Sequence, residues 1–162
     1  MLVEMQVSDL IAAASRVEDH VKLTGLRLTE TSSWSREPPT AAQLQTGMTI
    51  NVTARSDGTR VIADVEYNVR AEERECGGDQ AGERCWEVKC HYSVEYEAYT
   101  DVALATQDLE AFGIMSTTLT IHPYARAFIH DITAQMGYPP FNLPLLTTRD
   151  LAEMAKNAKI TV

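Results

Sequence analysis

The sequence predicts an α+β fold, in which a four-stranded antiparallel sheet is covered on one face by helices, with an additional helix at the N-terminus. Residues 86–98 alternate apolar and polar side chains without a break, as in a strand of a half-solvated sheet. Residues 48–54 and 61–69 alternate similarly, and Ser56-Asp57-Gly58 between them is typical of a hairpin turn. Helix-period apolar residues lie before and after the strands, which indicates a helical layer packed on the sheet.

Each element is then placed by its local signals. Ser8 and Asp9 are typical of a helix N-terminus, and this first helix is expected to end near Val21. Pro38 and Pro39 stiffen a linker between the first two strands, and residues 76–83 form a glycine-rich polar connection. The predicted helices are 8–21, 106–115, 120–136 and 148–157, and the predicted strands are 23–33, 48–54, 61–69 and 86–98.

The stretch from Thr120 to Leu146 is an apolar helix that runs into an apolar, proline-containing loop. Pro123 is expected in the first helical turn, where its missing N–H costs nothing. Gly137 follows the last turn, and Pro139-Pro140 prevent the helix from continuing. An apolar loop of this kind is either covered by another subunit or contacts apolar partners.

The composition predicts one domain over residues 1–162 and a partner that is not a polyanion. The chain has 44% hydrophobic residues and a net charge of −9. Nucleic acids and anionic membranes attract clustered positive charge, so neither is an expected partner. The N-terminus is acidic where a signal peptide is basic, and no apolar run is long enough to insert into a membrane. A cytoplasmic location is expected.

The candidate metal and catalytic groups are few, and we expect no metal, no cofactor and no enzymatic activity. Cys76, Cys85 and Cys90 with His91 form a C-x8-C-x4-C-H pattern that lacks the close cysteine pairs of zinc sites. The pattern favours unpaired thiols in a reducing compartment, with a regulatory Cys76–Cys85 disulfide as the less favoured interpretation. No nucleophile elbow or phosphate-binding glycine loop occurs.

An alternative interpretation is a small-ligand-binding α+β domain. In this case His122, His130 and the tyrosines of the fourth strand would line a closed pocket beneath a helical lid. The simpler interpretation is that His122 belongs to the start of the helix, while His130 and Asp131 lie on its polar face.

The segment from His122 to Leu143 resembles the signature of the SecB family of protein-export chaperones, although His122 replaces the usual aromatic residue. The matching residues are Pro123, Tyr124, Ala125, Arg126, Ile129, Asp131, Gly137, Tyr138, Pro139, Asn142 and Leu143. The resemblance implies a homotetramer, a dimer of dimers. It also implies an ATP-independent holdase that binds unfolded preproteins and delivers them to the SecA motor for protein export.

The resemblance also implies where partners bind. Clients would lie in an apolar groove lined by Met48, Ile50, Val52, Tyr138, Phe141, Leu143, Leu145, Leu151 and Met154. The motor would dock on the acidic sheet face at Glu30 and Glu87, although Trp34 stands where a second acid is expected on the first strand. The helix face formed by Phe128, Ile129 and Ile132 would pack the sheet and the tetramer interface.

Some features depart from the common family pattern. The N-terminal helix is additional, and Lys156 and Lys159 give the chain a basic end in place of an acidic one. The additional N-terminal helix and the altered docking residues resemble the atypical SecB-like chaperones that protect antitoxins of toxin–antitoxin modules. Protection of an antitoxin is therefore the alternative function, with the antitoxin as the partner.

Overall fold

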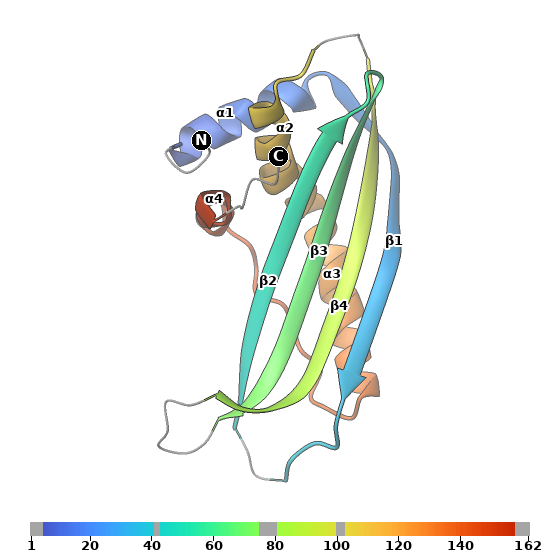
Figure 1. Ribbon diagram of the computed structural model, residues 1–162, viewed down its shortest axis with the longest axis vertical. Helices are drawn as coiled ribbons and strands as arrows, with labels where there is room; N and C mark the ends of the chain where they lie inside the picture. Colours follow the sequence, from blue (N-terminus) through green and yellow to red (C-terminus); the bar gives the residue numbers. More distant parts are fainter. Residues whose placement is uncertain (1–4, 41–42, 75–80, 100–102, 158–162) are drawn as a thin grey trace.

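A four-stranded antiparallel sheet forms one layer of the molecule, and helices cover one of its faces (Figure 1). The computed structural model describes residues 5–40, 43–74, 81–99 and 103–157. The strands are arranged in the order β1-β4-β3-β2. Their bounds are β1 (Val21–Ser35), β2 (Gln43–Ser56), β3 (Arg60–Arg74) and β4 (Ala81–Ala98). This architecture confirms the predicted α+β fold.

The two central strands alternate as predicted, with one face in the core and the other in solvent. Val61, Val65 and Tyr67 of β3 are fully buried, as are Val88 and Val94 of β4. The sheet is longer than expected because β2 begins at Gln43 instead of Met48. Residues 43–47 are mostly polar and show no alternation, yet backbone pairing with residues 70–74 of β3 makes them a strand.

The N-terminal helix α1 (Val7–Glu18) is shorter than predicted. Val21 opens β1 and pairs with Ala98, so the prediction that the helix extends to Val21 was wrong. Its N-cap lies two residues earlier than predicted, at Gln6 and not Ser8, and the backbone N–H of Gln6 donates to the Asp9 carboxylate over 3.3 Å. Leu10, Ala14 and Val17 are buried, as the apolar stripe predicted, whereas Ile11 is 44% exposed.

The two helices predicted after β4 are continuous. The helix α2 (Thr106–Phe112) runs through a π-helical segment, η2 (Gly113–Thr117), into α3 (Thr118–Gln135). Pro123 therefore lies inside α3 and not in a first turn, contrary to prediction. The carbonyl it leaves unpaired is that of Leu119, whose residue is 44% exposed, so water can satisfy that oxygen.

The π-helical segment fits tightly against β2. A Cβ atom on Gly113 would lie 3.1 Å from Ala54 Cβ and 3.1 Å from Val52 Cγ1. Any larger residue at this position would require these side chains to move by a few tenths of an ångström. The segment thus lets α2 pack near β2 while α3 continues over the central strands.

The chain after α3 forms a loop and a last helix beside β2. Gly137 has φ +82°, which favours glycine, and it ends the helix where predicted. The helix α4 (Thr148–Asn157) has the predicted bounds and buries Leu151, Ala152 and Ala155. The hydroxyl and backbone N–H of Thr147 both donate to the Asp150 carboxylate and cap this helix.

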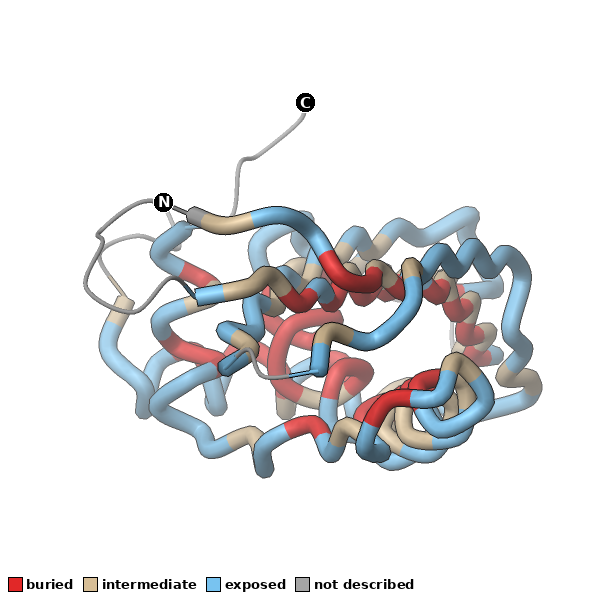
Figure 2. The backbone as a smooth tube through the Cα atoms, turned by 90° about the horizontal axis from the view of Figure 1, so that it is seen from below, coloured by how far each residue is buried: buried red, intermediate tan, exposed pale blue. Residues whose placement is uncertain are grey.

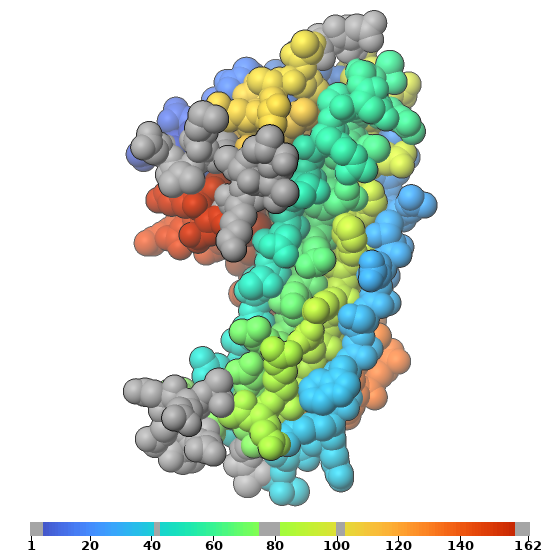
Figure 3. All heavy atoms as spheres, viewed as in Figure 1, coloured from blue at the N-terminus to red at the C-terminus, as the bar shows by residue number. Residues whose placement is uncertain are grey.

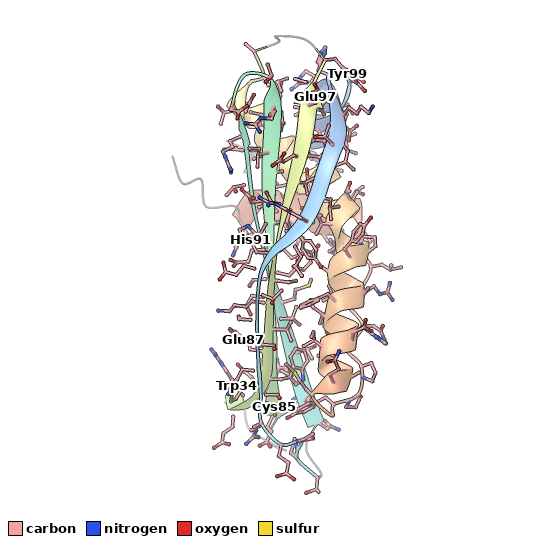
Figure 4. All side chains as sticks on the ribbon, turned by 90° about the vertical axis from the view of Figure 1, so that its right-hand side faces the viewer. Trp34, Cys85, Glu87, His91, Glu97 and Tyr99 are labelled. Carbon is pink, nitrogen blue, oxygen red and sulfur yellow. The ribbon has the colours of Figure 1, made fainter. Side chains whose placement is uncertain are left out.

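The core lies between α3 and the face of the sheet turned toward it, called here the inner face (Figure 2). Ile129 on α3 is fully buried, while Phe128 and Ile132 are half-buried against the core. The outer face carries charged side chains that point away from α3 (Figure 4). Among the described helices, none is long and apolar enough to cross a membrane.

Candidate functional site: an apolar groove beside β2

An apolar groove opens between β2, the loop after α3 and α4. Along this side, below α4 and beside β2, the outline of the molecule curves inward (Figure 3). The groove is lined by Met48, Ile50, Pro144, Leu145, Leu146, Asp150 and Met154. Among the described residues that line it, every side chain except that of Asp150 is apolar. The surface is therefore suited to apolar groups.

Strand register and sheet order explain the β2 side of the groove. Ile50 pairs with Tyr67 and Met48 with Val69, so their side chains share the inner face with buried residues of β3. Because β2 lies at the edge of the sheet, no further strand covers it. Met48 and Ile50 are consequently only half-buried, at the boundary between core and groove.

His122 fixes the loop side of the groove. The Nε2 atom lies 2.7 Å from the carbonyl oxygen of Pro144, and Nδ1 lies 3.0 Å from the hydroxyl of Tyr67. A carbonyl only accepts, so Nε2 carries the proton and Nδ1 accepts from the Tyr67 hydroxyl. Burial lowers the pKa of His122 and favours this neutral form. The imidazole thereby ties the loop to the central strand.

Two further contacts hold the loop. Thr133 Oγ1 accepts the backbone N–H of Phe141 over 2.8 Å. The hydroxyl of Tyr138 donates to the carbonyl of Arg36 over 3.1 Å, and burial raises the pKa of this phenol. Irregular backbone that is anchored in this way can present side chains in one fixed orientation.

The predicted groove residues separate into two groups. Met48, Ile50, Leu145 and Met154 converge on the groove. The prediction is corrected for Tyr138, Leu143 and Leu151, which are 4%, 1% and 0% exposed and belong to the core. The apolar loop gave no period by which inward and outward residues could be distinguished.

Val52 and Phe141 lie beside the groove without lining it. Val52 packs under Gly113, further along β2. Phe141 is half-buried, and its ring lies 5.5 Å from the ring of Trp86. Sequence reasoning missed Pro144, Leu146 and Asp150. The Thr147-x-x-Asp150 spacing, a helix-capping pattern, could have placed Asp150 at the start of α4.

The predicted docking acids both lie on the outer face. Glu30 on β1 is exposed and pairs with His91, whereas Glu87 on β4 pairs with Trp34 (Figure 4). The carboxylate of Glu87 lies 3.0 Å from Arg84 Nη1 and 3.1 Å from Lys89 Nζ. Glu87 is therefore partly neutralised, while Glu30 forms no ion pair with the described residues.

The closed pocket of the small-ligand alternative does not form from the residues predicted for it. His122 is engaged in the core, whereas His130 lies at the surface next to Asp131. Tyr92 and Tyr96 are buried, and the Tyr96 hydroxyl lies 3.0 Å from Thr117 Oγ1. These groups face different parts of the molecule, so the structure contradicts that arrangement.

The cysteine pattern seen in the sequence does not form a cluster of metal ligands among the described residues. Cys76 lies outside the described residues, and Cys85 and Cys90 are buried. Burial raises the pKa of Cys90 to about 12, which makes its thiol unreactive at neutral pH. Within the described ranges, no three His, Cys, Asp or Glu side chains gather as metal ligands would.

Comparisons with known proteins were made in sequence and in structure. No protein-family model matches the chain. Over 96 residues the sequence is 31% identical to the protein-export protein SecB of two strains of Caulobacter vibrioides. The match covers 59% of this chain and 52% of the relative, so the chain spans about half the length of the curated relatives it matches.

The fold was compared with a solved SecB-like chaperone from Mycobacterium tuberculosis, in complex with a ChAD peptide from the HigA1 antitoxin. The TM-score is 0.72 at 17% identity, covering 85% of this chain and 99% of the other. Both comparisons support the resemblance to the SecB family that was recognised in the sequence. The names of these relatives, an export protein and a chaperone, agree with the prediction that it is not an enzyme.

The SecB resemblance recognised in the sequence falls mainly on the scaffold of the groove. Of its matching residues, Ile129, Tyr138 and Leu143 are buried and Gly137 turns the chain out of α3. Leu145 and Met154 lie outside the matching positions and line the groove itself. The signature therefore accounts for one anchor of the loop, Tyr138, while His122 and Thr133, which also hold the loop, lie outside the matching positions.

Proposed function

We propose that this SecB-like protein is an ATP-independent holdase that binds extended apolar segments of unfolded proteins in the groove beside β2. The supporting observation is the exposure of Leu145, which is 75% exposed on an anchored loop. A large apolar side chain held in solvent costs free energy unless a partner covers it.

Groove chemistry supports broad recognition of unfolded chains. Burial of apolar surface contributes ~25 cal/mol per Å², so covering several hundred Å² can hold a segment without ATP after ordering costs. Met48 and Met154 stand on opposite sides of the groove. Their flexible thioether side chains can adapt to different client side chains.

The proposed assembly is a homotetramer, a dimer of dimers. Leu23 and Leu28 on β1 are 45% and 41% exposed, and Leu119 and Tyr124 on α3 are 44% and 54% exposed. Exposed apolar groups of this size favour association between copies. The expected mass in solution is four times 18.0 kDa, measured by light scattering after size-exclusion chromatography. A monomer at micromolar concentration would contradict this assembly.

Delivery of preproteins to the SecA motor for export is the finer part of the proposal. It is supported by the name of the curated relatives and by the exposed position of Glu30 on the outer face. Titration of SecA with the protein should show binding that Glu30→Lys weakens. Holdase activity without any binding to SecA would remove the delivery step and leave the holdase intact.

Protection of an antitoxin is the second candidate function. The structurally similar Mycobacterium tuberculosis chaperone was solved with an antitoxin peptide, and this chain also carries the helix α1 predicted as an addition to the common pattern. Capture from the native host distinguishes the candidates. Recovery of one small DNA-binding protein together with its toxin would favour antitoxin protection, whereas a mixture of preproteins would favour export.

The groove itself is tested by the aggregation of an unrelated, chemically denatured reporter protein. The wild-type protein should suppress light scattering, and Leu145→Ser should reduce this suppression severalfold. Tyr99→Ser is the matched control, because Tyr99 is 65% exposed but lies beyond the end of β4, outside the groove. Equal loss in both variants would exclude the groove as the client site.

A further inference from the structure

One end of the outer sheet face carries three half-exposed cations beside an exposed indole. Ser32, Ser33 and Trp34 of β1 line a pocket with Arg84 and Glu87 of β4. Arg70 and Lys89 adjoin it, because Arg70 pairs with Glu87 and Lys89 pairs with Ser32. We call this surface the Trp34 patch, formed by Trp34, Arg70, Arg84, Lys89 and the two acids between them, Glu72 and Glu87.

Cations and acids of the Trp34 patch lie at different depths. The side chains of Arg70, Arg84 and Lys89 are 50%, 55% and 46% exposed. Those of Glu72 and Glu87 are only 23% and 19% exposed. An approaching partner therefore meets the three cations before it meets the two acids.

Each of the two carboxylates also lies within ion-pair distance of two of these cations. Arg84 lies 3.0 Å from Glu87, and Lys89 lies 3.1 Å from the same carboxylate. Arg70 and Arg84 both approach Glu72 Oε1, at 3.5 Å and 3.9 Å. The two carboxylates hold the cations in place, and the cations keep unused N–H donors that point outward.

Trp34 supplies the apolar part of the same surface. The indole is 51% exposed and lies directly opposite Glu87 in the strand register. The net charge of the chain is −9, so a locally positive surface around an exposed indole needs a specific cause. Solubility does not explain these cations, because a chain that is negatively charged overall would be kept soluble by further negative charge.

We propose that the Trp34 patch binds a short peptide segment in which a carboxylate adjoins an aromatic side chain. The aromatic group would stack on Trp34, and the carboxylate would accept N–H donors from Arg84 and Lys89. A cationic segment would instead have to displace these two side chains from Glu87. The patch is separate from the groove, so this proposal does not depend on holdase activity.

The first test is a fluorescence titration of the full-length protein with two synthetic peptides, one containing Glu-Phe-Glu and the other Lys-Phe-Lys. Trp86 is 2% exposed, so a change in emission on binding reports mainly on Trp34. The acidic peptide should bind at least tenfold more tightly at low salt, and added salt should weaken it. Equal or tighter binding of the basic peptide would overturn the proposal.

Variants locate the site of that binding. Arg84→Glu combined with Lys89→Glu should abolish binding of the acidic peptide, whereas Glu87→Gln should strengthen it by removing the competing carboxylate. Arg60→Glu is the control, since Arg60 is exposed at the first residue of β3, at the end of the strand away from Arg70, and pairs with Asp57. Leu145→Ser should not affect binding. Loss of binding in Leu145→Ser, or its survival in the double variant, would place the peptide elsewhere and refute the patch.

A second measurement tests the local potential without a peptide. Iodide should quench Trp34 emission more steeply than caesium, with the contribution of Trp34 isolated by comparison with Trp34→Phe. More efficient quenching by caesium would show that the indole lies in negative potential. A change in solution mass on Trp34→Ala would show that a second copy covers the patch, and this result would also overturn the proposal.

Discussion

Leu143 and Leu145 stand two residues apart on one loop, yet their environments are opposite. Leu143 is 1% exposed and part of the core, whereas Leu145 is 75% exposed at the groove. The separation does not come from a regular strand, because Pro144 lies between the two leucines and no strand forms here. Anchoring by His122 on the Pro144 carbonyl fixes which leucine faces inward.

The difference teaches that a binding surface can be made from an ordinary apolar loop by holding it at a few backbone atoms. Residues on its inner side then stabilise the protomer, and residues on its outer side remain free for a partner. Four changes test this division, from the largest expected effect on stability to the smallest.

Leu143→Ala should destabilise the protein by about 2–5 kcal/mol, because it removes a fully packed side chain and leaves a cavity. Urea denaturation followed by circular dichroism measures the change. A loss below about 1 kcal/mol would mean that Leu143 is not part of the core. If the expected destabilisation is observed, any loss of client holding by Leu143→Ala follows from unfolding of the loop and not from a missing contact with the client.

Thr133→Val should cost about 1–3 kcal/mol, because the N–H of Phe141 loses its acceptor in a half-buried position. Thr133→Ser keeps the hydroxyl and serves as the control. Hydrogen exchange at the Phe141 amide should accelerate in the valine variant only. Unchanged protection of this amide would show that other contacts hold the loop.

Acidification should weaken the protein through His122. The pKa of this histidine is lowered from 6.5 in the folded state by burial, so the unfolded state binds the proton first. The contribution to the free energy of unfolding is complete above the unfolded pKa and is lost as pH falls through the folded pKa. Denaturation between about pH 7.5 and pH 5 measures the slope.

His122→Gln should flatten that slope, while the surface variant His130→Gln should leave it as in the wild type. Aggregation assays over the same range should show holding decline together with stability, since protonation places a charge on the buried imidazole and turns Nδ1 from the acceptor of the Tyr67 hydroxyl into a donor. A slope that survives in His122→Gln would assign the pH dependence to another group.

Leu145→Ala should change the free energy of unfolding by no more than about 0.5 kcal/mol, as expected for an exposed side chain. Its effect should appear in client holding, which falls while the oligomer stays intact. Leu143→Ala should thus lower the free energy of unfolding, whereas Leu145→Ala should lower client holding and leave that free energy almost unchanged. If both variants destabilise equally, the loop has no outward-facing side and the comparison fails.

Much of the fold could be predicted because sheet and helix periods are local. The alternation in residues 61–69 and 86–98 identified the inward-facing residues of β3 and β4. The bounds of α4 followed from a thin apolar edge formed by Leu151 and Met154. The junction at Gly113 could not be predicted, because a π-helical turn is stabilised there by its fit against Val52 and Ala54 of β2.

The site was predicted less completely for the same reason. Alternation placed Met48 and Ile50 on the inner face of β2, and the structure agrees. A proline-containing loop has no period, so Leu143 and Leu145 were indistinguishable in the sequence. Their orientation depends on a hydrogen bond between residues 22 positions apart, His122 and Pro144, which only the folded chain brings together.

The π-helical segment η2 has a consequence for how this chain tolerates change in length. Each residue of an α-helix advances the side chains by about 100° around the axis. A π-helical turn holds one residue more than an α-helical turn, so deleting a single residue from Gly113–Thr117 would let the segment close as a regular α-helix, whereas one further inserted residue would turn His122 and Ile129 off the sheet by about 100°. Substitutions in this segment are limited by volume, but its number of residues sets the rotational phase of the helix that carries the loop.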